Sequence, residues 1–181
     1  MFHIDASQMD HRQLNERIQH SSGTLLITGC RGQRFIGAGA EQGLLEIAGT
    51  PGNALGAYLD GACIEVRGNA QDAVGDTMNG GRIIVHGSIG DAAGYAMRGG
   101  EIYVQGDAGY RAGIHMKAYG DKVPALVIGG TAGSFLGEYQ AGGIILVLGL
   151  SQTGRPIVSN FPCTGMHGGK LYLRSDGSGL R

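Results

Sequence analysis

The sequence has few cysteines, no excess of charge of either sign and no long apolar run, and each shortage excludes a class of protein. Its three cysteines, Cys30, Cys63 and Cys163, are odd in number and far apart, so they form neither a disulfide framework nor a paired metal motif. With 14 Lys and Arg against 15 Asp and Glu and no basic cluster, nucleic acid is not expected as a partner. The longest apolar stretch, residues 142–150, is too short to cross a bilayer. We therefore expect a protein of the reducing cytoplasm without membrane partners.

Proline and aromatic residues are also scarce, whereas glycine is abundant. Four prolines and no tryptophan stand against 36 glycines in 181 residues. The glycines are periodic, since Gly49, Gly68, Gly87 and Gly106 follow one another at intervals of 19 residues, and this regularity argues against a disordered linker. A repeat of this length is too short for a strand-helix-strand unit, which needs about 30 residues. It predicts the stacked turns of a solenoid.

Each repeat carries an apolar residue four and two positions before an anchor residue that follows its strand. The anchors are Gly29, Gly49, Gly68, Gly87, Gly106, Gly130 and Gly149, with Ser175 in the last repeat. The pairs are Leu25/Ile27, Leu45/Ile47, Ile64/Val66, Ile83/Val85, Ile102/Val104, Leu126/Ile128, Ile145/Val147 and Leu171/Leu173. A spacing of two places both members on the same side of a β-strand. In a parallel β-helix such residues stack in columns at the strand spacing of about 4.8 Å. We therefore expect an all-β protein, a parallel β-helix of about eight coils of about 19 residues, with one domain over residues 1–181 and the coils over 22–175.

The only helical pattern lies at the N-terminus, within residues 1–20. Met9, Leu14 and Ile18 form an apolar stripe among polar residues, and Asp5 or Ser7 is placed to cap the helix. A solenoid exposes unpaired strand edges at its ends, which must be covered. We expect a short amphipathic helix here that caps the first coil.

Two longer intervals interrupt the period. The interval is 24 residues between Gly106 and Gly130, and 26 residues between Gly149 and Ser175. These intervals predict excursions at about 116–123 and 151–164. Insertions in a solenoid usually leave from one face, where binding often takes place.

The strand residue between the two buried columns should point outward. Along the coils its occupants are Leu26, Glu46, Glu65, Ile84, Tyr103, Val127, Leu146 and Tyr172. The last five are apolar or aromatic, and stacked at the strand spacing they make a stripe about 20 Å long, which a monomer seldom exposes. The candidate interface residues for a partner subunit or a second copy of the chain are therefore Ile84, Tyr103, Val127, Leu146, Leu148 and Tyr172. The alternative is that the N-terminal helix or an excursion covers the stripe internally.

Catalysis has weaker support in the sequence. Cys163, His167 and His115 could in principle supply a nucleophile and a base. Corner and loop positions explain them as well, and no carboxylate or further histidine is spaced to orient the base or to complete a metal site. We expect no catalytic, cofactor-binding or metal-binding residue on this chain.

Two ligand motifs are also rejected. Gly37-Ala38-Gly39 is not followed by the lysine and hydroxyl residue of a phosphate-binding loop, nor does it join a strand to a helix. A calcium-binding β-helix repeat needs aspartates at regular turn positions. The aspartates present, which read as out of register with one another, are Asp72, Asp76, Asp91 and Asp107.

The order of the glycines resembles a known family. The segment from Gly80 to Gly94, its near repeat from Gly99 to Gly113 and the stretch 129–139 (GGTAGSFLGEY) resemble the GXGXG domain, the C-terminal β-helix domain of the glutamate synthase large subunit. The resemblance runs from the helix before the first strand to the Gly165-Met166-His167-Gly168-Gly169 approach to the last one.

This resemblance implies a right-handed β-helix that does no chemistry itself and sits beside glutamine amidotransferase and FMN-binding synthase domains. The chain begins with Met1-Phe2 instead of a nucleophilic cysteine and lacks a (β/α)₈ pattern and clustered cysteines. We therefore expect a separately encoded structural subunit of a glutamate synthase-type complex, with FMN and an iron–sulfur cluster on partner chains. The alternatives are a β-helix subunit of a formylmethanofuran dehydrogenase-like complex and a stand-alone enzyme using Cys163, His167 and His115.

Overall fold

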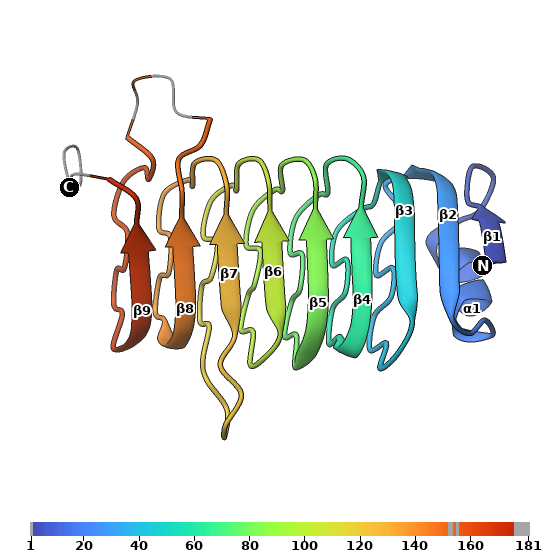
Figure 1. Ribbon diagram of the computed structural model, residues 1–181, viewed down its shortest axis with the longest axis horizontal. Helices are drawn as coiled ribbons and strands as arrows, with labels where there is room; N and C mark the ends of the chain where they lie inside the picture. The colour runs from blue at the N-terminus through green and yellow to red at the C-terminus, as the bar shows by residue number, and fades with distance from the viewer. Residues whose placement is uncertain (1, 152–153, 155, 176–181) are drawn as a thin grey trace.

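The chain folds as a solenoid built on a single parallel sheet (Figure 1). The computed structural model describes residues 2–151, 154 and 156–175. Nine strands lie side by side in the order of the sequence. Their bounds are β1 Phe2–Asp5, β2 Thr24–Arg31, β3 Leu44–Thr50, β4 Asp60–Val66, β5 Gly80–Val85, β6 Glu101–Val104, β7 Ala125–Ile128, β8 Ala141–Val147 and β9 Gly168–Leu173. The expected all-β parallel β-helix is confirmed, with the eight predicted strand positions β2 to β9 separated by seven full turns.

Strand register matches the apolar columns inferred from the sequence. Ile64 pairs with Ile83, and Val66 with Val85, as the alignment of the repeats requires. The inward residues from β2 to β8 are at most 3% exposed. In the last strand, β9, the inward residues Leu171 and Leu173 are only partly buried, because no further coil within the described residues lies on them. The core is therefore a continuous stack that runs along the whole solenoid axis.

The path back from one strand to the next uses a repeated five-residue segment in which every second residue is left-handed. In the first coil these residues are Phe35, Gly37 and Gly39, with φ of 59°, 67° and 66°. The segment bonds to both neighbours alternately: Gly56 N–H donates back to the Ile36 carbonyl, at 2.9 Å, and Gly39 N–H donates forward to the next coil. The middle residue is glycine in every such segment from Gly37 to Gly137, and at Gly56 a Cβ would clash with the strand side chain of Ile83, whereas in the last coil the middle residue is Cys163.

A side-chain ladder joins neighbouring coils at a corner. The Asp72 carboxylate accepts a hydrogen bond from Asp91 N–H at 2.9 Å, and the Asp91 carboxylate accepts one from Tyr110 N–H at 2.7 Å. Asp72 and Asp91 are thus equivalent positions in adjacent coils, which corrects the interpretation of these aspartates as out of register. Each carboxylate satisfies the backbone of the next coil.

The N-terminal cap contains the expected short helix, α1 (His11–Gln19), together with β1. Leu14 and Ile18 are buried as predicted, but the cap residue is Asp10, whose carboxylate accepts from the backbone of Arg12 and Gln13. Asp5, expected as a possible cap, instead accepts a hydrogen bond from Ser7 N–H at 2.9 Å. Strand β1, which pairs with β2, was not predicted.

Two connections leave the compact solenoid outline (Figure 1). One, between β6 and β7, turns at Tyr119 and Lys122, and the Lys122 ammonium lies 3.2 Å from the Asp60 carboxylate. The other follows β8; residues 152, 153 and 155 of the predicted excursion lie outside the described residues, and its later part returns Val158 to a bridge with Ala132. Within the described part of the chain, no helix has the length and apolarity needed to cross a bilayer.

Candidate functional site

The outward column of the sheet forms the stripe inferred from the sequence. Ile84 pairs with Tyr103, Tyr103 with Val127, and Val127 with Leu146, and the column ends at Tyr172 of β9. We call this column the sheet stripe. Tyr103 is 36% exposed and Tyr172 50%, while the three aliphatic members are half-buried by their neighbours in the sheet. Five side chains from five consecutive strands therefore present one apolar surface.

Further apolar residues widen the sheet stripe near β7 and β8. Ala125 pairs with Ile144 in the next outward column, and Leu148 continues from β8, its N–H donating to the Ile128 carbonyl at 2.9 Å. Ala125, Ile144 and Leu148 are each half-buried. The apolar surface is therefore broadest at the C-terminal end of the sheet.

An ion pair borders the sheet stripe at Tyr103. Arg82 of β5 contacts the Glu101 carboxylate of β6 at 2.6 Å, and its guanidinium carbon lies 5.8 Å from the centre of the Tyr103 ring. Burial is the main cause that raises the pKa of Tyr103 above its ordinary value. The Arg82 guanidinium therefore lies over one face of the Tyr103 ring, a cation–π contact at the border of the stripe.

The N-terminal half of the same column is ionic. Glu46 and Glu65 replace the apolar residues there, and Arg67 lies 3.4 Å from the first carboxylate and 3.6 Å from the second. His86 Nε2 lies 2.8 Å from the Glu65 carboxylate. The outward column therefore has an ionic part at β3 and β4, preceded by Leu26 of β2, and an apolar part from β5 to β9.

No described segment folds over the sheet stripe. Helix α1 lies at the β1–β2 end of the solenoid, whereas the stripe occupies β5 to β9 (Figure 1). The β6–β7 connection reaches along the strand beginnings, since Lys122 contacts Asp60 and the Asn79 carbonyl. Within residues 2–151, 154 and 156–175, the structure therefore does not support internal coverage.

The three residues considered for catalysis do not form a catalytic pair. Burial raises the pKa of the half-buried Cys163 thiol, which disfavours the thiolate. His167 Nδ1 lies 3.2 Å from the Gly165 carbonyl, and the His115 ring stacks on Tyr139 with centroids 5.2 Å apart. In the described residues, neither imidazole makes a hydrogen bond to the thiol. Nor do any three His, Cys, Asp or Glu side chains of that part gather as a metal site.

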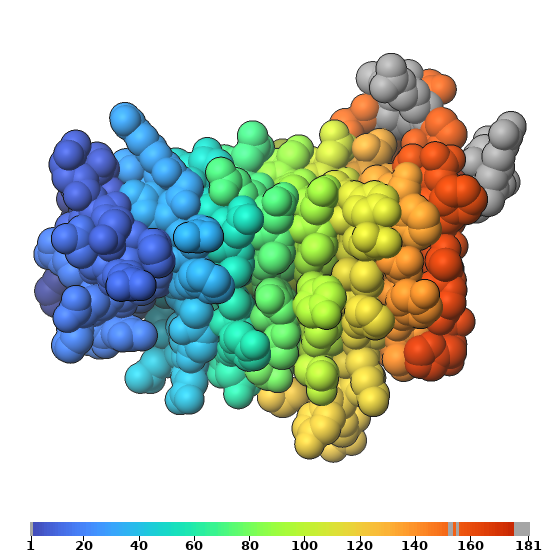
Figure 2. Space-filling view, turned by 180° about the vertical axis from the view of Figure 1, so that it is seen from behind, coloured from blue at the N-terminus to red at the C-terminus, as the bar shows by residue number. Residues whose placement is uncertain are grey.

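An aromatic surface on the return path, away from the sheet, was not found from the sequence. His115 lies between Tyr95 and Tyr139, while Phe135 contacts both Tyr110 and Phe161 at 5.3 Å. Figure 2, which shows the molecule from behind the view of the sheet, displays the coils there as parallel bands. The glycine anchors already align His115 with Tyr139, each nine residues after its anchor, but nothing in the sequence indicates that side chains at this position lie on the surface in contact.

An ion pair lies within this aromatic surface. Arg111 Nε contacts the carboxylate of the buried Glu138 at 2.6 Å, and the guanidinium carbon lies 4.6 Å from the Tyr110 ring centre. The hydrogen bond with Glu138 is the main cause that raises the pKa of Arg111. The aromatic surface therefore also contains charged groups, and the positive charge of Arg111 is neutralised by the carboxylate of Glu138.

Comparison with known proteins agrees with the glycine skeleton. The GXGXG motif family matches residues 7–180. The chain is also 47% identical over 184 residues to the "Uncharacterized protein MJ1350" of Methanocaldococcus jannaschii, an alignment that covers 96% of this chain and 70% of that protein.

Proposed function

This chain belongs to the GXGXG motif family, and we propose that it is a non-catalytic structural subunit of a multi-subunit glutamate synthase-type complex. In this role it positions a glutamine amidotransferase chain and an FMN-containing, iron–sulfur synthase chain in the cytoplasm. The resemblance of its glycine skeleton to the C-terminal domain of the glutamate synthase large subunit supports the choice of partners. The cofactors belong to those partners.

The observation that carries the scaffold role is the uncovered sheet stripe. Tyr103, Val127 and Leu146 stand in register on three adjacent strands, and the Arg82 guanidinium lies over the Tyr103 ring. A contiguous apolar surface bordered by charged residues is typical of the core of a protein interface. The ionic half at Glu46 and Glu65 supplies orientation more than affinity.

The state of Cys163 argues against the stand-alone enzyme. A nucleophilic cysteine needs a neighbour that lowers its pKa, whereas burial raises the pKa of this thiol. His115 is held between two tyrosine rings, so it does not serve as a base for that thiol in this conformation.

The test is purification of the tagged chain from its own organism at native expression, followed by mass spectrometry of the proteins that elute with it. We expect an amidotransferase chain and an FMN and iron–sulfur chain in stoichiometric amounts. Pterin-containing enzyme subunits would instead place the chain in a formylmethanofuran dehydrogenase-like complex. A chain that elutes alone would contradict the scaffold role.

Matched variants connect the partners to the surface. Leu146→Lys places a charge in the sheet stripe, whereas Tyr58→Lys changes a residue that is 59% exposed on the return path. We expect the first variant to lose the partner chains and the second to retain them. Equal retention by both variants would show that the partners dock elsewhere.

A further inference from the structure

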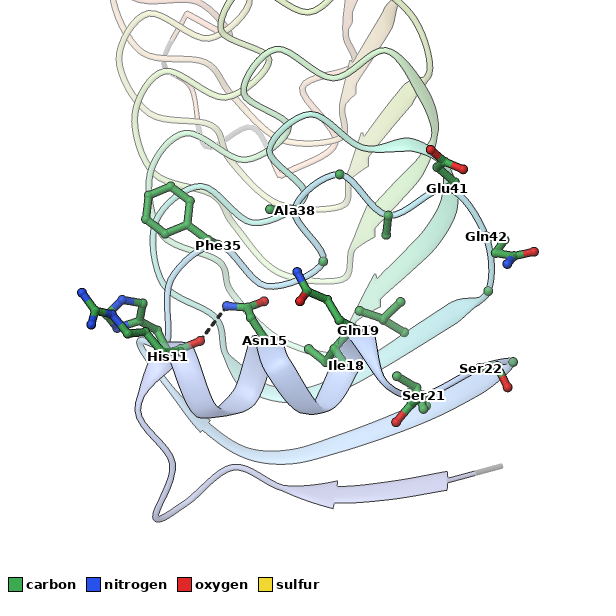
Figure 3. A pocket seen from close by; sticks show the side chains of 18 residues that line it. His11, Asn15, Ile18, Gln19, Ser21, Ser22, Phe35, Ala38, Glu41 and Gln42 are labelled. Atoms are coloured by element: carbon green, nitrogen blue, oxygen red, sulfur yellow. Dashed lines mark hydrogen bonds between the residues drawn. The ribbon is translucent and has the colours of Figure 1, made fainter.

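A cavity of about 720 Å³ lies between α1 and the return path of the first coil (Figure 3). Its apolar side is formed by Ile18, Leu25 and Leu45, and the polar side chains of Asn15 and Gln19 stand at its rim. The volume is in the range of binding pockets for small molecules and short peptides. The cavity exists because a helix, and not a preceding coil, covers this end of the solenoid.

Between later coils, four backbone groups of each return path bond to the coil before it. For the second coil these bonds are Phe35 N–H to Asn53 C=O, Gly56 N–H to Ile36 C=O, Gly39 N–H to Ala57 C=O and Asp60 N–H to Ala40 C=O, all between 2.8 and 3.0 Å. The first coil has the same conformation, with Gly37 and Gly39 left-handed. It therefore presents the same four groups toward α1.

Only one of these four groups has a partner within the described residues. The Arg34 carbonyl accepts a hydrogen bond from Asn15 Nδ2 at 3.0 Å. The Gly37 N–H, the Ala38 carbonyl and the Glu41 N–H line the cavity without a hydrogen-bond partner in the part that the structure describes. Gly37 is buried, and a buried N–H without a partner is rare in folded proteins because it loses its hydrogen bond to water.

We propose that this cavity binds a polypeptide segment that has the conformation of residues 35–40 and takes the place of the missing coil. The segment uses the same groups that residues 35–40 of the first coil offer to the second coil. Numbered from its first residue, these are the carbonyl of residue two, the N–H of residue five and the carbonyl of residue six. These meet Gly37 N–H, Ala38 C=O and Glu41 N–H in turn. Its third to sixth residues carry small side chains or none, as residues 37–40 do, because Ile18 and Gln19 of α1 already occupy part of the space. This site is at the opposite end from the sheet stripe and does not depend on the proposed function.

The probe is an acetylated and amidated hexapeptide, Phe-Ile-Gly-Ala-Gly-Ala, which copies residues 35–40. Amide NMR of the full chain follows its titration, with Gly56 as an internal reference because its N–H is already bonded. We expect saturable shifts and at least tenfold slower hydrogen exchange at Gly37 and Glu41, with Gly56 unchanged. A Gly37 amide that is as protected as Gly56 before any peptide is added would overturn the proposal.

Two controls make the result specific. Gln19→Trp fills the mouth of the cavity, whereas Arg17→Trp introduces the same side chain at an exposed position of α1 that does not line it. We expect the first variant to weaken the peptide at least tenfold and the second to bind as the unchanged chain does. A peptide with N-methylglycine at its fifth residue lacks one donor and should also bind at least tenfold more weakly. Shifts that survive Gln19→Trp, or equal shifts with acetamide at the same concentration, would refute a peptide site.

Discussion

A Cβ atom placed on Gly56 would lie 2.6 Å from the Cδ1 atom of Ile83 in the facing strand. Gly56 also has a φ of +63°, so alanine there meets both backbone strain and a clash with the core. Gly39 has a φ of +66°, but no atom lies within 4 Å of the position that a Cβ would take there. Alanine at position 39 therefore meets the backbone strain without the clash.

We therefore expect Gly56→Ala to lower the free energy of unfolding by roughly 2–4 kcal/mol and Gly39→Ala by about 1 kcal/mol. Urea denaturation followed by circular dichroism measures both. Equal losses for the two variants would mean that packing against Ile83 does not require glycine at position 56.

A core position and an outward position on two adjacent coils give the second prediction. Val85 is fully buried, so Val85→Asp places an unpaired carboxylate in the core and should cost more than about 4 kcal/mol. Gln105 is exposed, and Gln105→Asp should change the free energy of unfolding by less than about 0.5 kcal/mol. Thermal melts of both variants test this, and comparable damage from both would mean that the strand register is wrong.

The sequence predicts the strands well because the same pair of apolar residues precedes the anchor in every repeat. Ile64, Ile83 and Ile102 precede their anchors by the same interval, and coils of equal length stack in only one register that buries all of them. The outward column follows from the same alternation, so the residues of the sheet stripe are identified by sequence. Their exposed fractions, and the ion pair of Arg82 with Glu101 beside them, depend on the three-dimensional neighbours.

Other features lack a repeated signal. Strand β1 has only Ile4 as a buried apolar residue and no glycine anchor, so nothing in the sequence separates it from a loop. His115 and Tyr139 adopt left-handed φ values of 55° and 53°, a conformation that sequence rules reserve mostly for glycine. Hydrogen bonds to the following coil hold both residues there, and this is what places their rings in contact.

The pair Arg111 and Glu138 gives the third prediction. Glu138 is only 5% exposed, so Arg111→Met leaves a buried carboxylate without its cation. We expect this variant to melt at a lower temperature than the double variant Arg111→Met with Glu138→Gln, in which the charge is removed as well. If the double variant were the less stable of the two, loss of packing on Tyr110 would outweigh the unpaired charge.

The cysteines give a prediction on pH. Burial raises the pKa of the Cys30 thiol to about 11 and raises those of Cys63 and Cys163 as well. At pH 8 all three should react with iodoacetamide more slowly than a free cysteine, Cys30 slowest, as peptide mass spectrometry would show. A Cys163 rate that levels off near neutral pH would indicate an activated thiolate and would revive the enzyme hypothesis.

The raised pKa of Cys30 also makes the free energy of unfolding depend on pH. Because folding raises the pKa of Cys30, the folded state favours the neutral thiol. This contribution is complete below the ordinary thiol pKa of about 8.5 and is lost as the pH rises through about 11. The Cys30→Ala variant should therefore lose less stability than the unchanged chain between these two pH values, measured by urea denaturation.

The sheet stripe predicts how the isolated chain behaves. An apolar surface about 20 Å long that is left uncovered favours association of a second copy, so the isolated chain should sediment as a concentration-dependent mixture of monomer and larger species. Val127→Lys should shift it to monomer, because the charge would lose its hydration between the two copies, whereas Tyr58→Lys on the return path should leave the mixture unchanged. If the isolated chain stays monomeric at every concentration, the half-burial of Ile84, Val127 and Leu146 within the sheet is already enough to keep the stripe from associating. The proposed scaffold role would then require a larger docking surface than the stripe alone.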